Sequence, residues 1–277
     1  MATPITAPLP WRPSLLYLAS AACHVVAVLA VLAAPASWPW ALAAVALNHL
    51  FITAQGLWPR SRWLGENIVH LPAAAVARRE VCITIDDGPD RQVTPAVLDL
   101  LDAHGAKATF FCIAERAAAH PDLCREIVRR GHGIENHSHS HSHRFSLLGA
   151  GGFARELGQA QDTLRDVTGR APRFFRAPAG LRNPMLTPVL RRMGLRLVSW
   201  TRRGYDTVQN DPARVLAKLT RRLSAGDILL LHDGNAARAP NGRPVVLEVL
   251  PELLSLIERR GLHPVTLAHA MPDEASA

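Results

Sequence analysis

The sequence predicts an α/β protein in which about seven parallel strands close, or nearly close, into a barrel after an N-terminal helical hairpin. Short, continuously apolar runs alternate with amphipathic helical patterns, which is typical of parallel strands covered by helices. Ionisable residues follow five of these runs, and two long uncharged segments lie near the start of the chain. These observations indicate a barrel domain that follows an N-terminal anchor.

Two apolar segments, residues 15–34 and 40–57, contain no Asp, Glu, Lys or Arg. Each is close to the ~20 residues with which a helix crosses a bilayer. Tryptophans, which favour membrane interfaces, stand near their ends: Trp38, Trp40, Trp58 and Trp63. We therefore predict that residues 1–58 form a membrane anchor of two transmembrane helices. The first segment also fits a signal peptide, but a second segment so close behind it favours a retained anchor.

The orientation of this anchor follows from its flanking charges. Arg12 precedes the first segment, Arg60 and Arg62 follow the second, and the turn between them has no Lys or Arg. The positive-inside rule then places both ends, and the following domain, on the cytoplasmic side of the inner (cell) membrane. Asn48 and His49 weaken the second segment, and if only one segment spans, the domain lies outside.

The chain of 277 residues has a net charge of +8, which permits nucleic acid or anionic lipid as a partner. No zinc-finger, RNA-recognition or helix-turn-helix motif is present, so we expect membrane lipids and no nucleic acid. The four cysteines form no C-x-x-C pair and indicate core residues rather than a disulfide framework: Cys23, Cys82, Cys112 and Cys124.

The rest of the chain divides into a connector (59–79), a catalytic domain (80–270) and a tail (271–277). The apolar runs predict strands at 81–86, 108–113, 132–137, 173–178, 195–200, 227–233 and 263–267. Residues 94–105 begin with Thr and Pro and end with Gly, which is typical of a helix, and 244–261 is a second helical pattern. In a parallel barrel the carboxyl ends of the strands form the rim that carries chemistry.

Ionisable side chains meet at this rim. They follow the first, third, fourth, fifth and sixth strands, respectively: Asp86 and Asp87; Glu135 and His137; Arg176; Asp206; His232 and Asp233. Each of these residues taken alone has an explanation without function, since Asp beside Gly and Pro favours turns and a lone arginine is usually a surface residue. Five strands that deliver ionisable groups to one end indicate a functional site.

The stretch "ENHSHSHSHR" (135–144) contains histidines at every second position. His137 and His141 are four residues apart, so one helical turn after the strand would place both imidazoles on one face. A carboxylate from a neighbouring strand would complete a three-ligand metal site of the catalytic zinc type. His139 and His143 have the same spacing, so a register two residues further on stays open.

Such a site has a defined chemistry. The bound water becomes a nucleophile near neutral pH, a second carboxylate can accept its proton, and a histidine can protonate the leaving group. Asp86 and Asp87 suit two of these roles, because successive strand residues point to different sides and one can ligate while the other acts as base.

Five motifs, in order, resemble those of the polysaccharide deacetylase family, the NodB-homology group of carbohydrate esterases (family four). They are "TIDDGP", "HSHSH", "RAPAG", "SWTRRGYD" and the "LLH" of "DILLLHD". The resemblance covers about residues 80 to 270. It implies a distorted (β/α) barrel of about seven strands and hydrolytic removal of acetyl from an N-acetylated sugar.

The resemblance also implies roles for individual residues. One divalent metal ion, zinc by the nature of its N and O donors, is held by three side chains: Asp87, His137 and His141. Asn136 and Ser138 align with the family motif in a way that favours His137 and His141 as the ligands over His139 and His143.

Four further side chains act in catalysis by the same resemblance. Asp86 is the general base and Arg176 orients it, whereas His232 is the general acid and Asp206 tunes it. The backbone amide at Ala179 helps to bind the oxyanion.

Three positions depart from the family pattern: Ala179 replaces a common aromatic residue, Thr207 a common Trp, and Arg144 a usual Pro. Fewer aromatic residues reduce the surface for stacking sugars, which favours a short or lipid-linked saccharide. We predict a membrane-anchored, metal-dependent hydrolase that removes N-acetyl groups from an amino-sugar-containing glycan or lipid-linked saccharide. The alternatives are an extracytoplasmic peptidoglycan or exopolysaccharide deacetylase, a deformylase of a lipid-linked amino sugar, and a non-catalytic glycan-binding protein.

Overall fold

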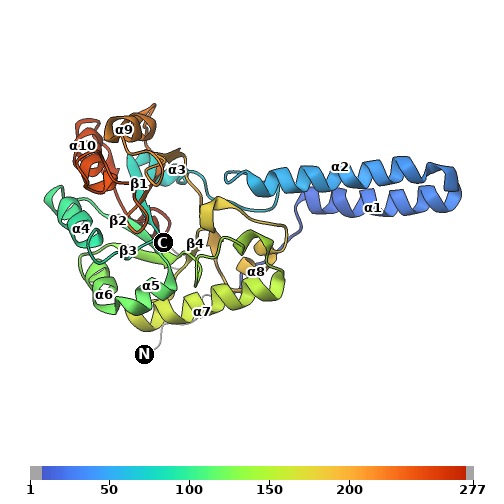
Figure 1. Ribbon diagram of the computed structural model, residues 1–277, viewed down its shortest axis with the longest axis horizontal. Coiled ribbons are helices and arrows are strands. Elements are labelled where there is room, and N and C mark those ends of the chain that lie inside the picture. Colours follow the sequence, from blue (N-terminus) through green and yellow to red (C-terminus); the bar gives the residue numbers. More distant parts are fainter. Residues whose placement is uncertain (1–7, 273–277) are drawn as a thin grey trace.

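The computed structural model describes residues 8–272. Two long helices lie side by side and project as a rod from an α/β domain (Figure 1). Most of the predicted tail, residues 273–277, lies outside the described residues.

The rod consists of α1 (Leu15–Ala33), a short 3₁₀ turn η1 (Pro35–Ser37) and α2 (Trp38–Leu57). The two predicted helices are confirmed with nearly the expected limits. By length and composition the segments Leu15–Ala33 and Pro35–Leu57 are able to cross a membrane, and only 11% of each is buried. A signal sequence near an N-terminus meets the same criteria of length and composition.

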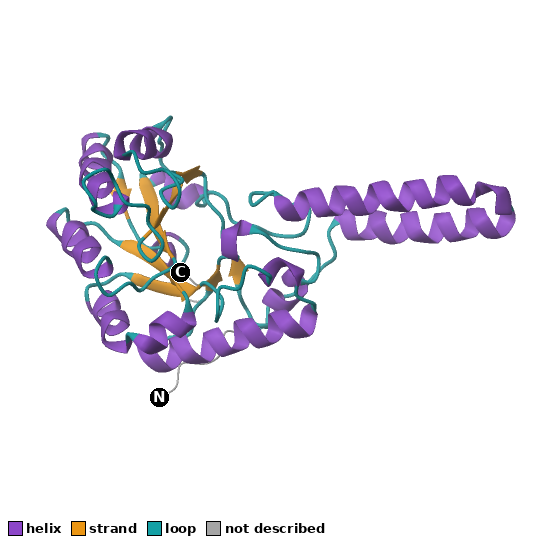
Figure 2. Cartoon of the chain, in the orientation of Figure 1, coloured by secondary structure: helices purple, strands orange, loops and turns teal. Residues whose placement is uncertain are grey.

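The domain is built on one parallel sheet, shown as arrows in Figure 2. Its strands are β1 (Glu80–Asp86), β2 (Ala108–Cys112), β3 (Gly133–Asn136), β4 (Phe174–Phe175), β5 (Arg196–Leu197), β6 (Arg202–Arg203), β7 (Ile228–His232) and β8 (His263–Pro264). Their order is β5-β4-β3-β2-β1-β7-β6, and β8 pairs with the start of β1. Each predicted apolar run contains one strand. The short β6 was not predicted, because its two arginines give no apolar signal.

The sheet curls into an incompletely closed barrel. β5 and β6 are the two ends of the strand order, yet only residues 198–201 separate them in the chain. Because a residue spans at most ~3.6 Å, the two edges must lie close together. Ile68 of the connector pairs with Val198 at this seam. The predicted parallel, distorted barrel is therefore confirmed.

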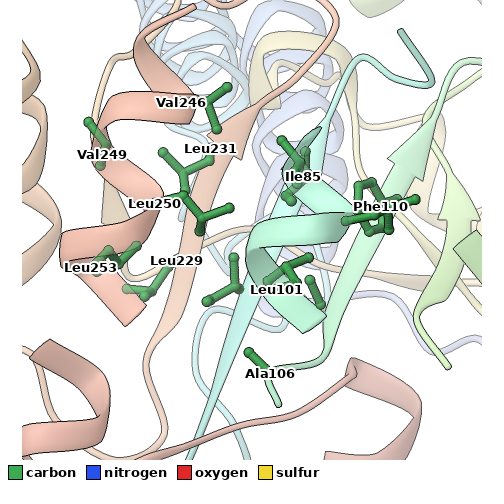
Figure 3. Close-up of a cluster of buried hydrophobic side chains, with 14 of the residues drawn as sticks. Ile85, Leu101, Ala106, Phe110, Leu229, Leu231, Val246, Val249, Leu250 and Leu253 are labelled. Carbon is green, nitrogen blue, oxygen red and sulfur yellow. The ribbon is translucent and has the colours of Figure 1, made fainter. Parts of the chain in front are cut away.

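Helices cover the outside of the barrel (Figure 1). The helices of the domain are α3 (Ala73–Ala77), α4 (Thr94–Ala103), α5 (Ala114–Ala119), α6 (Pro121–Arg129), α7 (Ala150–Thr168), α8 (Leu186–Arg192), α9 (Pro212–Thr220), α10 (Val245–Arg259) and α11 (Leu267–Ala270), with 3₁₀ turns η2 (Phe145–Leu147) and η3 (Pro178–Gly180). The short α3 and α11 pack instead on the inner side of the sheet, in the cluster that contains Cys82. In the core between sheet and helices, Leu229 and Leu231 of β7 face Val246 and Leu250 of α10 (Figure 3).

Alternation along β1 positions the site. Ile83 and Ile85 belong to the core beneath the helices, whereas Thr84 and Asp86 point into the barrel and contact Arg176. The polar end of β1 therefore faces the interior at the carboxyl rim.

Candidate active site

A cavity of about 190 Å³ opens at this rim, and it is lined by Asp86, Asp87, His137, His141, Ala179, Gly180, Trp200, Arg203, Thr207, Leu230, His232 and Asn235. Strand register explains the convergence: Asp86 is the partner of His232 across β1 and β7. Parallel strands that end together place their last side chains at one level.

Asp86 is held by a buried arginine. Arg176 Nη1 donates to Asp86 Oδ1 at 2.6 Å and to the Thr84 hydroxyl at 2.7 Å. Arg176 Nη2 donates to the carbonyl of Ser199 at 2.9 Å, and its guanidinium lies 4.1 Å from the centre of the Phe111 ring. The side chain is 1% exposed, so it fixes one Asp86 oxygen and leaves Oδ2 on the side of the histidines.

Asp87, His137 and His141 form a compact donor set. Asp87 Oδ1 lies 3.2 Å from the Nε2 atoms of both histidines, yet it is buried without a hydrogen-bond partner. Asp87 Oδ2 accepts a hydrogen bond from Asn235. His137 Nδ1 lies 2.8 Å from the Arg176 carbonyl, which requires Nδ1–H to donate and leaves the Nε2 lone pair in the cavity. An orphaned carboxylate oxygen beside two imidazole nitrogens fits one divalent metal ion.

The protonation states of Asp87 and His141 also favour metal binding. Burial alone raises the pKa of Asp87, but the hydrogen bond and charge of His137, with His232 and His141 nearby, hold it well below its usual range. Burial, together with the charge of His137, lowers the pKa of His141 to about 4. A carboxylate and a neutral imidazole are the forms that bind metal.

The loop that presents the two histidines is not the helical turn that the spacing suggested. Residues 137–144 form no helix, and Ser138 and His141 have positive φ of 66° and 52°. Asn136 Oδ1 accepts from the Ser138 amide, and the Ser138 hydroxyl accepts from the His141 amide at 3.0 Å. Such local side-chain bonds compete with helix formation, so that expectation was wrong although the two rings do meet.

The other two histidines of the stretch lie elsewhere. His139 Nε2 is 3.8 Å from Glu115, and its amide donates to Glu156. His143 is exposed. Across residues 8–272, the group of potential metal ligands at this rim contains neither of them.

The expectation that strand alternation directs Asp86 and Asp87 to different sides was also wrong. Asp86 is the last residue of β1, whereas Asp87 has left the strand with φ of 71°. Both line the same cavity. The turn of the backbone, rather than the pleat, directs one carboxylate to Arg176 and the other to the histidines.

His232 is held across the cavity by a buried carboxylate. His232 Nδ1 lies 2.9 Å from Asp206 Oδ1, and the His232 amide donates to Asp206 Oδ2 at 2.7 Å. Burial alone lowers the pKa of His232, but the charge and hydrogen bond of Asp206 raise it above its ordinary value. Asp206 thus engages Nδ1, and the ring of His232 lines the cavity.

Ala179 lines the cavity within η3 and has a left-handed backbone with φ of 53°. The next residue, Gly180, is closely packed: a Cβ there would come within 2.6 Å of Pro59 and 2.7 Å of Trp200. The connector that follows α2 therefore supports this wall. Of the residues that depart from the family pattern, Thr207 also lines the cavity, whereas Arg144 is exposed.

Sequence reasoning missed several residues that the structure brings to the site. Asn235 holds Asp87 Oδ2, and Arg116 donates to the carbonyls of Asp87 and Gly234. Arg203 belongs to the cavity wall. Two of them had a signal in the sequence: Asn235 is a polar residue in the loop that follows His232, and Arg203 stands inside the motif "SWTRRGYD".

Comparison with known proteins agrees with this geometry. Residues 73–198 match the family model described as polysaccharide deacetylase. The chitooligosaccharide deacetylase of Azorhizobium caulinodans is 34% identical over 188 residues, which are 65% of this chain and 89% of the relative. A peptidoglycan-N-acetylglucosamine deacetylase of Bacillus cereus is 30% identical over 69% of this chain and 87% of its own length. A family 4 carbohydrate esterase from Streptomyces lividans, solved with acetate, superposes with a TM-score of 0.60 at 29% identity and covers 67% of this chain and 91% of its own.

The chain belongs to the polysaccharide deacetylase family. The predicted enzyme class, a hydrolase of carbon–nitrogen bonds other than peptide bonds, is confirmed with it. The predicted domain limits (1–58, 59–79, 80–270 and 271–277) stay predictions.

Proposed function

We propose that the protein is a membrane-anchored, zinc-dependent deacetylase that acts on an N-acetylated amino sugar in a short or lipid-linked saccharide. One observation carries the proposal, the convergence in one cavity of a held carboxylate, a metal-type donor set and a held histidine: Asp86 with Arg176; Asp87, His137 and His141; His232 with Asp206. The substrates printed in the names of the relatives, chitooligosaccharide and peptidoglycan N-acetylglucosamine, support an amino sugar.

The proposed reaction uses these groups in sequence. Zinc held by Asp87, His137 and His141 would polarise the acetyl carbonyl and lower the pKa of a water molecule. Asp86 accepts the proton of the attacking water at Oδ2, while Arg176 holds Oδ1. The water oxygen adds to the carbonyl carbon, and the Ala179 amide donates to the developing oxyanion. His232 protonates the sugar nitrogen from Nε2 as the C–N bond breaks, which releases acetate and a free amine.

The hairpin supports the membrane part of the proposal. Its large apolar side chains are exposed, such as Leu29 (58%) and Leu32 (74%). Two polar pairs bond across the two helices: Asn48 Nδ2 donates to the Ser20 hydroxyl at 2.9 Å, and the Nε2 atoms of His24 and His49 lie 3.2 Å apart. Inside a bilayer polar groups need such internal partners.

The base of the hairpin adjoins the cavity wall, which supports a substrate at the membrane surface. Two residues after α2 ends, the Pro59 carbonyl accepts a hydrogen bond from the Ser199 hydroxyl at 2.7 Å. The Arg60 guanidinium reaches the Thr201 carbonyl at 3.5 Å. With Arg12, Arg60 and Arg62 at the ends of the hairpin, we place the domain on the cytoplasmic side.

The test is turnover by the full-length, zinc-loaded chain in detergent. N,N′-diacetylchitobiose and its N-formyl analogue are offered, and released acetate and formate are measured. We expect acetate release that a chelator abolishes and that added zinc restores. Faster formate release would favour the deformylase, and no release of either acid would contradict the proposed activity on a short saccharide.

Topology needs a separate measurement. Reporters that work only in the cytoplasm or only outside are fused after Ala277. Activity of the inside reporter is expected. Activity of the outside reporter would instead favour peptidoglycan or an exopolysaccharide as substrate, and it would leave the metal chemistry untouched.

A further inference from the structure

We infer that the cavity has a phosphate-binding subsite centred on Arg203, which receives the phosphate that joins the amino sugar to a lipid carrier. The inference rests on the proposed deacetylase function and specifies its substrate class. It starts from an arginine that the deacetylation steps do not use.

Arg203 carries a charge that nothing in the described chain neutralises. It lines the cavity together with Asp86 and His232. Its Nε is buried without a hydrogen-bond partner, and no carboxylate of residues 8–272 lies within 4.0 Å of its guanidinium. A partly buried, unpaired cation is unfavourable unless a ligand of opposite charge completes it.

Two other arginines near this cavity, Arg202 and Arg176, do have partners, so the lack of a partner is specific to Arg203. Arg202 pairs with Asp227 at 3.1 Å and donates to the Arg222 carbonyl. Arg176 is fully occupied by Asp86 and by backbone carbonyls. Arg203 alone of these three presents unused donors to the substrate cavity.

The guanidinium is also pre-oriented. Its central carbon lies 5.2 Å from the centre of the Trp200 ring and 5.0 Å from that of Tyr205. Aromatic contacts of this kind hold the planar fork, which matches the oxygens of a phosphate group.

Two more cations lie outside the cavity lining, beside residues that flank Arg203 in the chain. Lys218 Nζ lies 4.7 Å from the Tyr205 ring, and Arg60 reaches the Thr201 carbonyl. Neither has a carboxylate within 4.0 Å among the described residues. Deacetylation of a neutral amide needs none of these charges, and three of them suit a phosphate better than a single carboxylate. The wall also adjoins the base of the proposed anchor, where a lipid phosphate would lie.

The test is calorimetric binding to the full-length, zinc-loaded chain in detergent, in an Asp86→Asn background that prevents turnover. Four probes are compared: methyl N-acetylglucosaminide, N-acetylglucosamine 1-phosphate, the farnesyl ester of that phosphate, and N-acetylmuramic acid. We expect both phosphates to bind about ten- to a hundred-fold more tightly than the methyl glycoside. Arg203→Gln should bring that ratio close to one, whereas Arg203→Lys should keep part of it.

Arg221→Gln is the matched control, because it removes the same charge from an exposed position outside the cavity lining and should leave the ratio unchanged. A phosphate preference that survives Arg203→Gln would overturn the inference, because the metal itself would then be the site. No phosphate preference, including no binding of any probe, would also overturn it. If the farnesyl ester binds more weakly than the free sugar phosphate, or if N-acetylmuramic acid binds most tightly, the inference of a lipid-linked substrate is overturned. An intact phosphate preference, together with no acetate release by the chain that keeps Asp86, would count against the deacetylase function alone.

Discussion

Two pairs of histidines lie close together in this molecule, and their surroundings differ. At the rim of the barrel the rings of His137 and His141 are 4.8 Å apart, and Asp87 Oδ1 lies 3.2 Å from each Nε2. In the hairpin the rings of His24 and His49 are 5.2 Å apart, and their Nε2 atoms face each other at 3.2 Å.

The difference shows what makes a metal site out of two imidazoles. The rim pair directs its lone pairs at a shared point where a carboxylate adds charge and a third donor. The hairpin pair directs its two Nε2 atoms at each other, one as donor and one as acceptor, and His24 Nδ1 lies 2.7 Å from the Ser20 carbonyl. Residues 15–57 contain no Asp or Glu that would add a third ligand there. We therefore expect metal chemistry at the rim alone and helix pairing in the hairpin.

The largest expected effect is at the rim pair. His137→Ala should remove both stoichiometric zinc and activity, because it deletes one of three donors. Metal content per chain, measured by mass spectrometry, checks this. His139→Ala is the matched control and should spare both. Equal losses at His139 and His137 would mean that the other register binds the metal.

The second test separates the metal from the chemistry. Asp86→Asn should keep the zinc and lower kcat by about 10²–10⁴-fold, because an amide cannot accept the proton of the water. Metal content and acetate release are measured on the same preparation. A variant with nearly the wild-type rate would remove Asp86 from the role of base.

A third histidine sharpens the comparison, since His232 is engaged by a carboxylate through Nδ1. A general acid works in its protonated form, so the rate falls as pH rises through its pKa. Asp206 raises the pKa of His232, so Asp206→Asn should move this alkaline fall of kcat/KM to lower pH. An unchanged pH profile would show that another group supplies the proton.

The smallest expected effect is in the hairpin. His49→Leu should leave zinc content and kcat unchanged and weaken the association of α1 with α2 by about 0.6 kcal/mol. Thermal unfolding in detergent measures the loss, and Leu47→Ile, at an exposed position of the same helix, is the control. Loss of metal in the His49 variant would contradict the division of roles between the two pairs.

Much of the fold could be predicted because its signals are local. The hairpin follows from uninterrupted apolar segments, and the strands follow from short apolar runs such as 81–86 and 227–233. β6 could not be found in this way, since Arg202 and Arg203 join the sheet only through their pairing with β7. The loop after β3 was misjudged as a helical turn because Asn136 and Ser138 use their side chains to shape it.

The sequence by itself determined which kinds of side chain stand at the strand ends, because one short stretch encodes both a strand and the residue that follows it. Asp86, Asp87, His137 and His232 needed no more than that. Tertiary structure alone decided which charges are neutralised. Arg202 pairs with Asp227, whereas Arg203 has no carboxylate within 4.0 Å among residues 8–272. Asn235 reaches Asp87 from the loop after β7, 148 residues away in the chain. Such pairings depend on contacts between segments far apart in the chain, which composition and spacing do not encode.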